Sequence, residues 1–260
     1  MSKDDYQHHF KKSLGQNFLN NKKYINELID CLDIKENDLI IEIGPGKGFV
    51  TDEILKRTKN LILIEKDDSL IPYLTEKFNS KVKIIHQDVL EVIFSDITSN
   101  KPYKVIGSLP YNISKKIIYN LLRNTHKPSQ ISLIIQKEVA KEYSAKAPKA
   151  SLLSNFATLY SDVKLSKVVP SIYFTPKPKV DGQMITFSNI SQKYEDINDL
   201  WKFIRIGFSS PRKILASNLK VYEKDKVIAG LVELKMSEKA RASEMTQTQW
   251  LELYNLVKSG

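Results

Sequence analysis

A glycine-rich turn directly after an apolar run gives this chain its first candidate ligand site. The run Leu39–Ile43 leads into Gly44-Pro45-Gly46-Lys47-Gly48, and a helical pattern begins at Phe49. Glycines in a turn between a buried strand and a helix let the backbone approach a ligand at the helix N-terminus. The dinucleotide pattern G-x-G-x-x-G needs a third glycine where this chain has Phe49. The segment therefore predicts a ligand-binding turn of another class.

Glu42, which precedes the turn, gives the spacing E-x-G-x-G-x-G, which is typical of methyltransferases that bind S-adenosyl-L-methionine (SAM). Two further acids close the next two apolar runs: Glu65, 21 positions after Gly44, and then Asp88. At the carboxyl ends of neighbouring parallel strands, Glu65 can accept the ribose hydroxyls and Asp88 the adenine amino group of a nucleoside ligand. Each acid alone would also fit a helix cap or a solvated strand end.

The segment Gly107-Ser108-Leu109-Pro110-Tyr111 closes a fourth apolar run and suits chemistry on an exocyclic amine. It is close to the [DNS]-P-P-[YFW] motif of enzymes that methylate amino groups on bases. The lone pair of such a nitrogen is delocalised into the ring, so acceptors must hold its N–H groups and pull the nitrogen towards tetrahedral geometry. The Ser108 side chain and the Leu109 carbonyl can do this. Pro110 stiffens the turn, and Tyr111 offers a face on which a flipped-out base can stack.

The elements that must position these residues alternate between strand and helix patterns over about the first 190 residues. This alternation predicts an α/β fold, a Rossmann-like, mostly parallel sheet with helices on both faces. The stretch Val168–Phe187 contains three prolines and predicts an extended loop that leads to a late antiparallel strand at the end of the sheet. The expected strands are Leu39–Ile43, Leu61–Ile64, Val82–Ile85, Lys104–Ile106 and Ile131–Ile135, and the expected helices are Phe49–Arg57, Ser69–Phe78 and Ser114–Arg123.

After Ser188 only helical spacing of apolar residues is found, which predicts a second, all-helical domain. We expect a SAM-binding methyltransferase domain over residues 1–190 and a helical C-terminal domain over 191–260, with the polar stretch Ser188–Asn198 as the linker. The expected helices of this domain are Asn198–Phe208, Pro211–Leu219, Glu223–Leu231 and Thr246–Val257.

Composition narrows the class of protein. One cysteine among 260 residues excludes a disulfide framework, and the four histidines show no metal-ligand spacing, so we expect no metal. The amino end has no apolar core of a signal peptide, and no apolar run reaches the length of a membrane span, so we expect a cytoplasmic protein. The net charge of +10 favours a polyanionic partner, although a lysine-rich protein with solvated faces would look the same.

The lysines are expected to form a basic surface around the mouth of the SAM cleft. The candidates are Lys11, Lys12, Lys22 and Lys23 near the amino end, lysines of the 137–179 stretch and lysines of the helical tail. Lysine is a point charge that suits phosphate backbones, whereas arginine is preferred for reading bases.

The chain resembles the KsgA family of small-subunit (16S) ribosomal RNA adenine-N6,N6-dimethyltransferases, and the resemblance spans nearly the whole sequence. It rests on the shared order of several short segments. These are Gly15-Gln16-Asn17-Phe18-Leu19, Glu42–Gly48, Leu109–Ser114, Gln136-Lys137-Glu138-Val139, Phe174–Asp181, Phe208–Leu219 and Arg241-Ala242-Ser243-Glu244. The resemblance implies SAM-dependent dimethylation of two adjacent adenosines in the 3′-terminal hairpin of the RNA, with the immature small subunit as partner. We expect a monomer.

The resemblance also implies roles for particular residues. SAM contacts fall to Asn17, Leu19, Gly44, Glu65, Asp88 and Ser108, with Gly46 in the same turn, and Tyr111 and Phe174 are expected to sandwich the target adenine. The family has Asn where this chain has Ser108, whose shorter side chain can accept one N–H and could slow transfer. Two alternatives therefore stay open: a ribosome-assembly factor with weakened methylation, and the sister family that methylates large-subunit RNA and confers macrolide resistance. The segments Phe208–Leu219 and Arg241-Ala242-Ser243-Glu244 resemble those of the family that acts on the small subunit, and they favour that family.

Overall fold

The computed structural model describes residues 15–258, and the chain divides into two compact units. The first consists of the chain up to Ala140 together with Lys164–Ile190, and the second consists of Lys141–Val163 together with the chain from Ser191 onward. No helix within residues 15–258 has the length and apolar character needed to cross a membrane.

The first unit is built on a seven-stranded sheet with the strand order β4-β3-β2-β5-β6-β9-β7. Neighbouring strands from β4 to β6 pair in parallel, and β9 pairs antiparallel with β6. The strands are β2 (Leu39–Ile43), β3 (Leu61–Glu65), β4 (Lys83–His86), β5 (Tyr103–Ser108), β6 (Gln130–Gln136), β7 (Asp162–Val169) and β9 (Gly182–Ser188).

The centre of this sheet positions the site. The aliphatic side chains of β2 and β3 are buried, except that Leu39 is half-buried, as expected for parallel strands that are covered on both faces. The register places Ile43 of β2 beside Ile64 of β3 on one side and Gly107 of β5 on the other. The turn after β2, the end of β3 and the end of β5 therefore meet at the carboxyl edge, where the order of the strands reverses between β2 and β5. Open α/β sheets bind ligands at such an edge.

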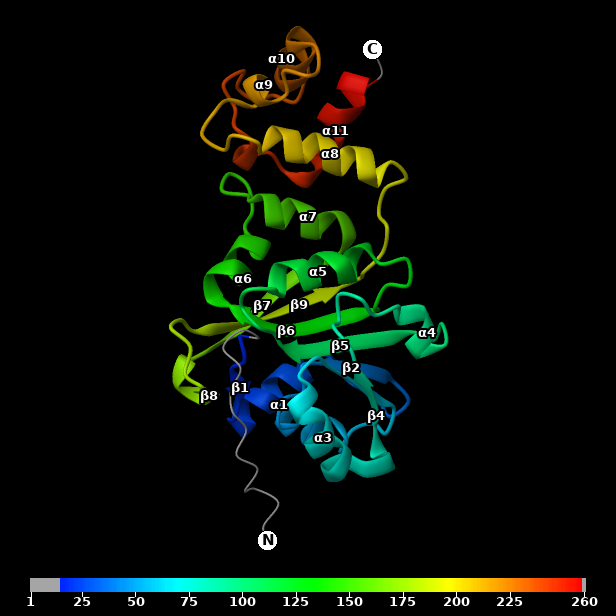
Figure 1. Ribbon diagram of the computed structural model, residues 1–260. Helices are drawn as coiled ribbons and strands as arrows, with labels where there is room; N and C mark the ends of the chain where they lie inside the picture. The colour runs from blue at the N-terminus through cyan, green and yellow to red at the C-terminus, as the bar shows by residue number, and fades with distance from the viewer. Residues whose placement is uncertain (1–14, 259–260) are drawn as a thin grey trace. The chain divides into compact units, whose positions relative to one another are not determined.

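Amphipathic helices cover both faces of the sheet. In Figure 1, α1 and α3 lie on one side of the sheet and α5 lies on the other. α5 buries the stripe formed by Ile117, Ile118, Leu121 and Leu122. The helices of this part of the chain are α1 (Lys22–Asp30), α2 (Phe49–Ile54), α3 (Ile71–Phe78), α4 (Phe94–Thr98), α5 (Ser114–Arg123) and α6 (Lys137–Ser144), the last of which crosses the boundary between the units.

A separate two-stranded antiparallel ladder joins two segments that are far apart in the sequence. β1 (Phe18–Leu19) pairs with β8 (Phe174–Thr175), so that Phe18 lies opposite Thr175 and Leu19 lies opposite Phe174.

The second unit is helical and has an aromatic core. The Phe203 ring packs edge-on against the rings of Trp250 and Tyr254, and the Phe156 ring contacts Trp201. The helices are α7 (Leu152–Tyr160), α8 (Ile197–Gly207), α9 (Leu215–Asn218), α10 (Lys224–Glu233) and α11 (Gln247–Lys258).

The predicted α/β class with a helical C-terminal part is confirmed, and several details differ from the prediction. β7 was not expected, because most of its side chains are exposed and Lys164 and Lys167 interrupt its apolar residues, so no continuous apolar run marks it. β9 is antiparallel as expected, but β7 lies outside it, so β9 does not end the sheet. Residues 141–163 group with the helical unit, because α7 packs against α8 and α11.

Candidate active site

A hollow at the carboxyl edge of the sheet collects most of the residues that the sequence singled out. Its lining comes from the segment before β1, the turns after β2 and β3, the segment after β4, the end of β5 and the start of α5. Among the lining residues are Asn17, Gly44, Glu65, Asp88, Ser108 and Pro110. Apolar side chains between them, such as Ile64, Val89 and Ile113, give the hollow walls against which a flat ring can pack.

The glycine turn opens directly onto this hollow. Gly44 has a left-handed φ of 68°, and a Cβ placed on it would meet no atom within 4 Å. Gly46 is also left-handed, at 57°, but a Cβ there would collide with the Phe18 ring, and its N–H donates to Glu65 Oε2 over 3.3 Å. Gly44 therefore faces the ligand space, whereas Gly46 holds the turn against the protein.

Glu65 is buried below the turn and serves as an acceptor for backbone groups. Oε1 accepts the N–H groups of Lys66 and Asp67, both at 2.8 Å, while Oε2 accepts the N–H of Gly46. Burial raises the pKa of Glu65, and these three N–H groups oppose that rise. A carboxylate has about four acceptor positions, so three backbone donors leave capacity for roughly one hydroxyl of a ligand.

Asp88 reaches the hollow from the segment after β4 and forms an ion pair with Lys66. Lys66 Nζ lies 2.8 Å from Asp88 Oδ2, and Leu90 N–H donates to Asp88 Oδ1 over 2.9 Å. Burial raises the pKa of Asp88, but the hydrogen bond and charge of Lys66 outweigh burial, so the pKa lies below its ordinary value. Lys66 was not among the residues expected in the site, although its place directly after Glu65 put it at the same edge of the sheet.

Ser108 ends β5 and lines two adjoining hollows. The second is smaller and is also lined by Asn17, Leu19, Gly44 and Glu42. The close approach of β5 to β2 depends on Gly107, because a Cβ there would lie 2.7 Å from the Ile43 carbonyl oxygen. Leu109 buries its side chain and donates its N–H to the Ile134 carbonyl over 3.0 Å.

Glu42, beside the smaller hollow, is a buried carboxyl group. Thr51 Oγ1 donates to Glu42 Oε2 over 2.6 Å, and only 2% of Glu42 is exposed. Burial, together with the negative charges of Glu65 and Asp52, raises the pKa of Glu42 to about 8. The group is therefore mostly neutral at pH 7, and no positive ligand group is needed to balance it.

Tyr111 and Phe174 lie together, but they do not line either of these hollows. A Cβ placed on Gly182 would lie 3.2 Å from Phe174 Cζ and 3.4 Å from the Tyr111 hydroxyl oxygen, so both rings approach the same glycine. Only 3% of Phe174 is exposed. The Tyr111 hydroxyl is buried without a hydrogen-bond partner among residues 15–258, and burial with the charge of Asp181 raises its pKa to about 12. A base can enter between these rings only if they move apart.

The main hollow fits the nucleoside part of SAM. It combines an open glycine turn, a buried carboxylate with a free acceptor position, a second carboxylate on the next strand and apolar walls. Asn17 is held at its edge by a hydrogen bond from its Nδ2 to the Gly15 carbonyl, 3.0 Å long. Lys11 and Lys12, expected near the mouth of this cleft, lie outside the described residues.

Comparison with known proteins identifies the family. Residues 7–259 match the family described as ribosomal RNA adenine dimethylase. The chain is 35% identical to "Ribosomal RNA small subunit methyltransferase A" of Mycoplasma capricolum, covering 95% of this chain and 97% of that protein. It is 37% identical to the protein of the same name from Clostridium perfringens, covering 81% and 76%.

Solved structures agree on the fold. A dimethyladenosine transferase from Plasmodium falciparum superposes with a TM-score of 0.79 at 23% identity, covering 91% of this chain and 95% of that one. The 23S rRNA methyltransferase ErmE superposes with a TM-score of 0.77 at 20% identity, covering 93% and 100%. The chain belongs to the ribosomal RNA adenine dimethylase family, whose members are SAM-dependent methyltransferases.

Proposed function

We propose that this protein transfers methyl groups from SAM to the N6 atoms of two adjacent adenosines in the 3′-terminal hairpin of small-subunit ribosomal RNA. Support comes from the names of relatives at 35–37% identity, which act on the small subunit. The observation that carries the proposal is the convergence of Gly44, Glu65, Asp88 and Ser108 on one hollow at the carboxyl edge of the sheet.

In this proposal the cofactor-binding residues are Asn17, Leu19, Gly44, Gly46, Glu65, Asp88 and Ser108. Glu65 accepts a ribose hydroxyl with its remaining acceptor position, and Asp88 accepts the adenine amino group. Gly46 acts through Glu65, because its N–H holds that carboxylate in place. Gly44 leaves the turn open for the part of the cofactor that reaches towards Ser108.

The residues that act on the target base are Ser108, Leu109, Pro110, Tyr111 and Phe174. Bound SAM supplies an electrophilic methyl group. The Ser108 hydroxyl and the Leu109 carbonyl accept the two N–H groups of the target amine, so that the nitrogen becomes more tetrahedral and its lone pair points into the hollow. Tyr111 and Phe174 move apart to hold the flipped base by stacking. The methylated nitrogen loses its proton readily, so no strong base is required.

The buried Tyr111 hydroxyl supports this movement. It has no hydrogen-bond partner within the described chain, and an unsatisfied buried hydroxyl is unfavourable by about 1–3 kcal/mol. A base or phosphate that supplies an acceptor for this hydroxyl would recover part of that energy as the rings open. We also propose that the enzyme acts as a monomer in the cytoplasm, on the immature small subunit.

The test is methyl transfer from SAM to unmethylated small subunits, with the modified bases mapped, and with large subunits as the matched control. We expect methylation of two adjacent adenosines in the 3′ hairpin of the small-subunit RNA and none of the large subunit. Methylation of the large subunit alone would instead identify the macrolide-resistance activity. Tight binding to small subunits without methyl transfer would identify an assembly factor, which is the alternative that Ser108 keeps open.

A further inference from the structure

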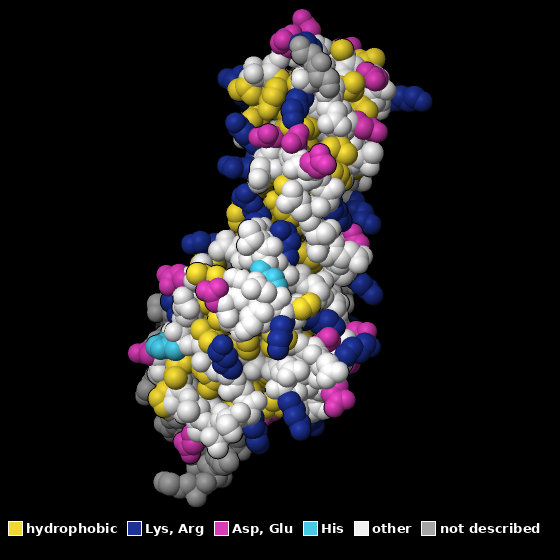
Figure 2. Space-filling model, turned by 90° about the vertical axis from the view of Figure 1, so that its right-hand side faces the viewer, with side chains coloured by type: hydrophobic (Ala, Val, Ile, Leu, Met, Phe, Trp, Pro, Cys, Tyr) yellow, Lys and Arg dark blue, Asp and Glu magenta, His cyan; other side chains and the backbone are white. Residues whose placement is uncertain are grey.

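The opposite edge of the sheet carries a second hollow, which the proposed reaction does not use. It lies at the amino ends of β2, β3, β4 and β5, and its rim holds four exposed lysines, Lys59, Lys81, Lys83 and Lys101. Strands of about five residues rise roughly 16 Å. The hollow is therefore about that far from the carboxyl edge, where Ser108 lies. Figure 2 views the side on which α4 lies in Figure 1, and dark-blue side chains stand over the middle of the lower part of that face.

The four lysines have no acidic partner in the described part of the chain. None of their ammonium groups forms an ion pair or a hydrogen bond with residues 15–258, although other lysines of this unit, such as Lys66 and Lys77, pair with acids at 2.8 and 2.7 Å. Positive charge is therefore concentrated at this hollow without internal neutralisation.

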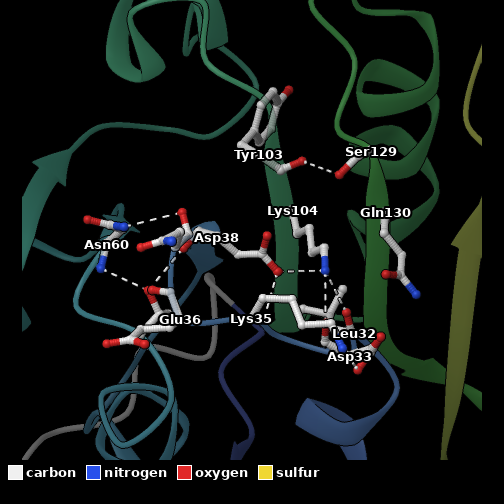
Figure 3. A network of polar contacts seen from close by, with 12 residues as sticks. Leu32, Asp33, Lys35, Glu36, Asp38, Asn60, Tyr103, Lys104, Ser129 and Gln130 are labelled. Carbon is white, nitrogen blue, oxygen red and sulfur yellow. Dashed lines mark hydrogen bonds and ion pairs between the residues drawn. The ribbon is translucent and has the colours of Figure 1, made fainter.

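The negative charge of Asp38, the single acid that lines the hollow, is balanced by an ion pair with Lys104. Lys104 Nζ lies 2.7 Å from Asp38 Oδ2 and also donates to the carbonyls of Leu32 and Asp33, both at 3.0 Å. The Lys35 N–H donates to the same Asp38 oxygen over 2.9 Å. Figure 3 shows Lys104 reaching from β5 towards this group of acceptors. With Asp38 held in this way, the hollow presents its four rim lysines to solvent and little negative charge.

The remaining lining is polar and uncharged or aliphatic. Asn37, Asn60, Ser80 and Ser99 can donate hydrogen bonds, and no aromatic side chain and no arginine is among the lining residues. Aromatic rings would stack bases, and arginine would read base edges, whereas lysine binds phosphate as a point charge. The lining therefore suits a polyphosphate backbone and offers nothing for reading its sequence.

We propose that this hollow, named here the amino-edge lysine hollow, binds the phosphodiester backbone of RNA outside the target hairpin. The proposal rests on the proposed function for the identity of the RNA. The strands β4, β3, β2 and β5 are neighbours, so three spacings of about 4.8 Å give a rim roughly 14 Å wide, enough for more than one backbone phosphate. The concave shape fits a strand of nucleic acid better than a flat membrane. Since the target base enters at the opposite edge, the two sites contact different parts of one large substrate.

The test is a fourfold variant, Lys59→Gln, Lys81→Gln, Lys83→Gln and Lys101→Gln, with the fourfold Lys→Arg variant at the same positions as the control that keeps the charge. Binding to unmethylated small subunits is measured over a series of salt concentrations. We expect the Gln variant to lower the slope of log Kd against log salt by about 2–4 and to weaken binding at 0.15 M salt on the order of 10²-fold. The Arg variant should retain the parental slope.

Two further arms make the result specific. Methyl transfer to an RNA trimmed to the target loop and its closing base pairs should be unchanged in the Gln variant, because so short an RNA does not span the roughly 16 Å between the two edges. Non-specific double-stranded RNA should show the same loss of slope as small subunits, because the contact is independent of sequence.

An unchanged slope in the Gln variant on both RNAs would overturn the proposal, as would a loss confined to an acidic polypeptide such as polyglutamate. An equal loss for the Arg variant would show a structural effect in place of a charge effect. In one further outcome, the parent protein fails to methylate small subunits while the Gln variant still shows a lower slope of log Kd against log salt on double-stranded RNA. In that case the proposed function fails and the hollow remains an RNA-binding site.

Discussion

Leu19 lies opposite Phe174 in the two-stranded ladder of β1 and β8. Leu19 lines the smaller hollow beside Ser108, and Phe174 begins the loop that we propose holds the target base. Asn20 reinforces the pair, because its N–H donates to the Tyr173 carbonyl over 3.1 Å and its Nδ2 donates to Thr175 Oγ1 over 3.0 Å. The ladder thus fixes the base-holding loop to the segment at the cofactor hollow.

Phe174 is buried, so it has two roles that can be tested separately: packing in the core and the proposed stacking on the target base. Phe174→Ala should lower the free energy of unfolding by about 3–5 kcal/mol, because the ring belongs to the core cluster of the first unit. Phe174→Leu retains much of the apolar volume and should lose only on the order of 1 kcal/mol in urea unfolding. The Leu variant should still transfer methyl groups about 5- to 150-fold more slowly, if the ring stacks on the base with roughly 1–3 kcal/mol. Transfer at the parental rate by this folded variant would confine Phe174 to the core.

Glu65→Gln tests the cofactor carboxylate. The substitution keeps the volume but removes the charge, and its amide NH₂ would face the backbone N–H groups that the carboxylate now accepts. The loss of a charge-assisted acceptor is worth about 1.5–3 kcal/mol, so SAM should bind roughly 10- to 150-fold more weakly in calorimetry. Glu91→Gln, a change at an exposed acid outside the hollow, is the control and should bind normally. Parental affinity in Glu65→Gln would remove this residue from the site.

Lys66→Met tests the ion pair with Asp88. Lys66 supplies the main influences that lower the pKa of Asp88 against burial, so its removal should raise that pKa, which NMR titration of the carboxyl carbon can follow. The charged carboxylate is the form that accepts an amino group. As the pH is lowered, Asp88 takes up its proton earlier in the Met variant. The loss of SAM affinity should therefore begin at a higher pH in the Met variant than in the parent. Lys66→Arg should restore the parental profile, and identical profiles for all three proteins would argue against Asp88 as the adenine acceptor.

The sheet was predictable because its central strands are buried on both faces. β2 is a continuous apolar run around Glu42, and its predicted bounds, Leu39–Ile43, are those of the structure. β1 and β8 have two residues each, too few for any periodicity to show, and only their pairing across more than 150 positions creates them. β7 contains four apolar residues, but Lys164 and Lys167 interrupt them, so no continuous apolar run marks it.

The candidate site was predictable in position but not in its internal bonding. Glu65, Asp88 and Ser108 come at the ends of strands, so the parallel sheet had to bring them to one edge. The three backbone donors to Glu65 and the approach of Tyr111 and Phe174 to Gly182 depend on how loops close in three dimensions, which no spacing in the sequence expresses.

Glu42 predicts a pH dependence of stability. Its pKa is about 8 in the folded chain against an ordinary value of 4.5, so the folded chain keeps a proton that the unfolded chain has released. This contribution to stability is complete below about pH 4.5, declines as the pH rises and is level again above about pH 8. Glu42→Gln stays neutral, so its free energy of unfolding should rise relative to the parent by a few kcal/mol between pH 5 and pH 8. Urea unfolding at both pH values checks this. If the difference in free energy of unfolding between the Gln variant and the parent is the same at both, Glu42 is charged in the folded chain.

Ser108 gives the sharpest test of the proposed chemistry. Ser108→Ala removes the side-chain acceptor and leaves the Leu109 carbonyl, so single-turnover methyl transfer to small subunits should slow by roughly 5- to 10-fold, the value of one neutral hydrogen bond of about 1 kcal/mol. Ser108→Asn introduces the residue that the family usually has there, and its transfer rate should equal or exceed that of the parent. SAM affinity should change less than the transfer rate in both variants, because Gly44, Glu65 and Asp88 still line the cofactor hollow. If Ser108→Ala transfers methyl groups as fast as the parent, the side chain at this position does not hold the amino group, and the mechanism must rely on backbone acceptors alone.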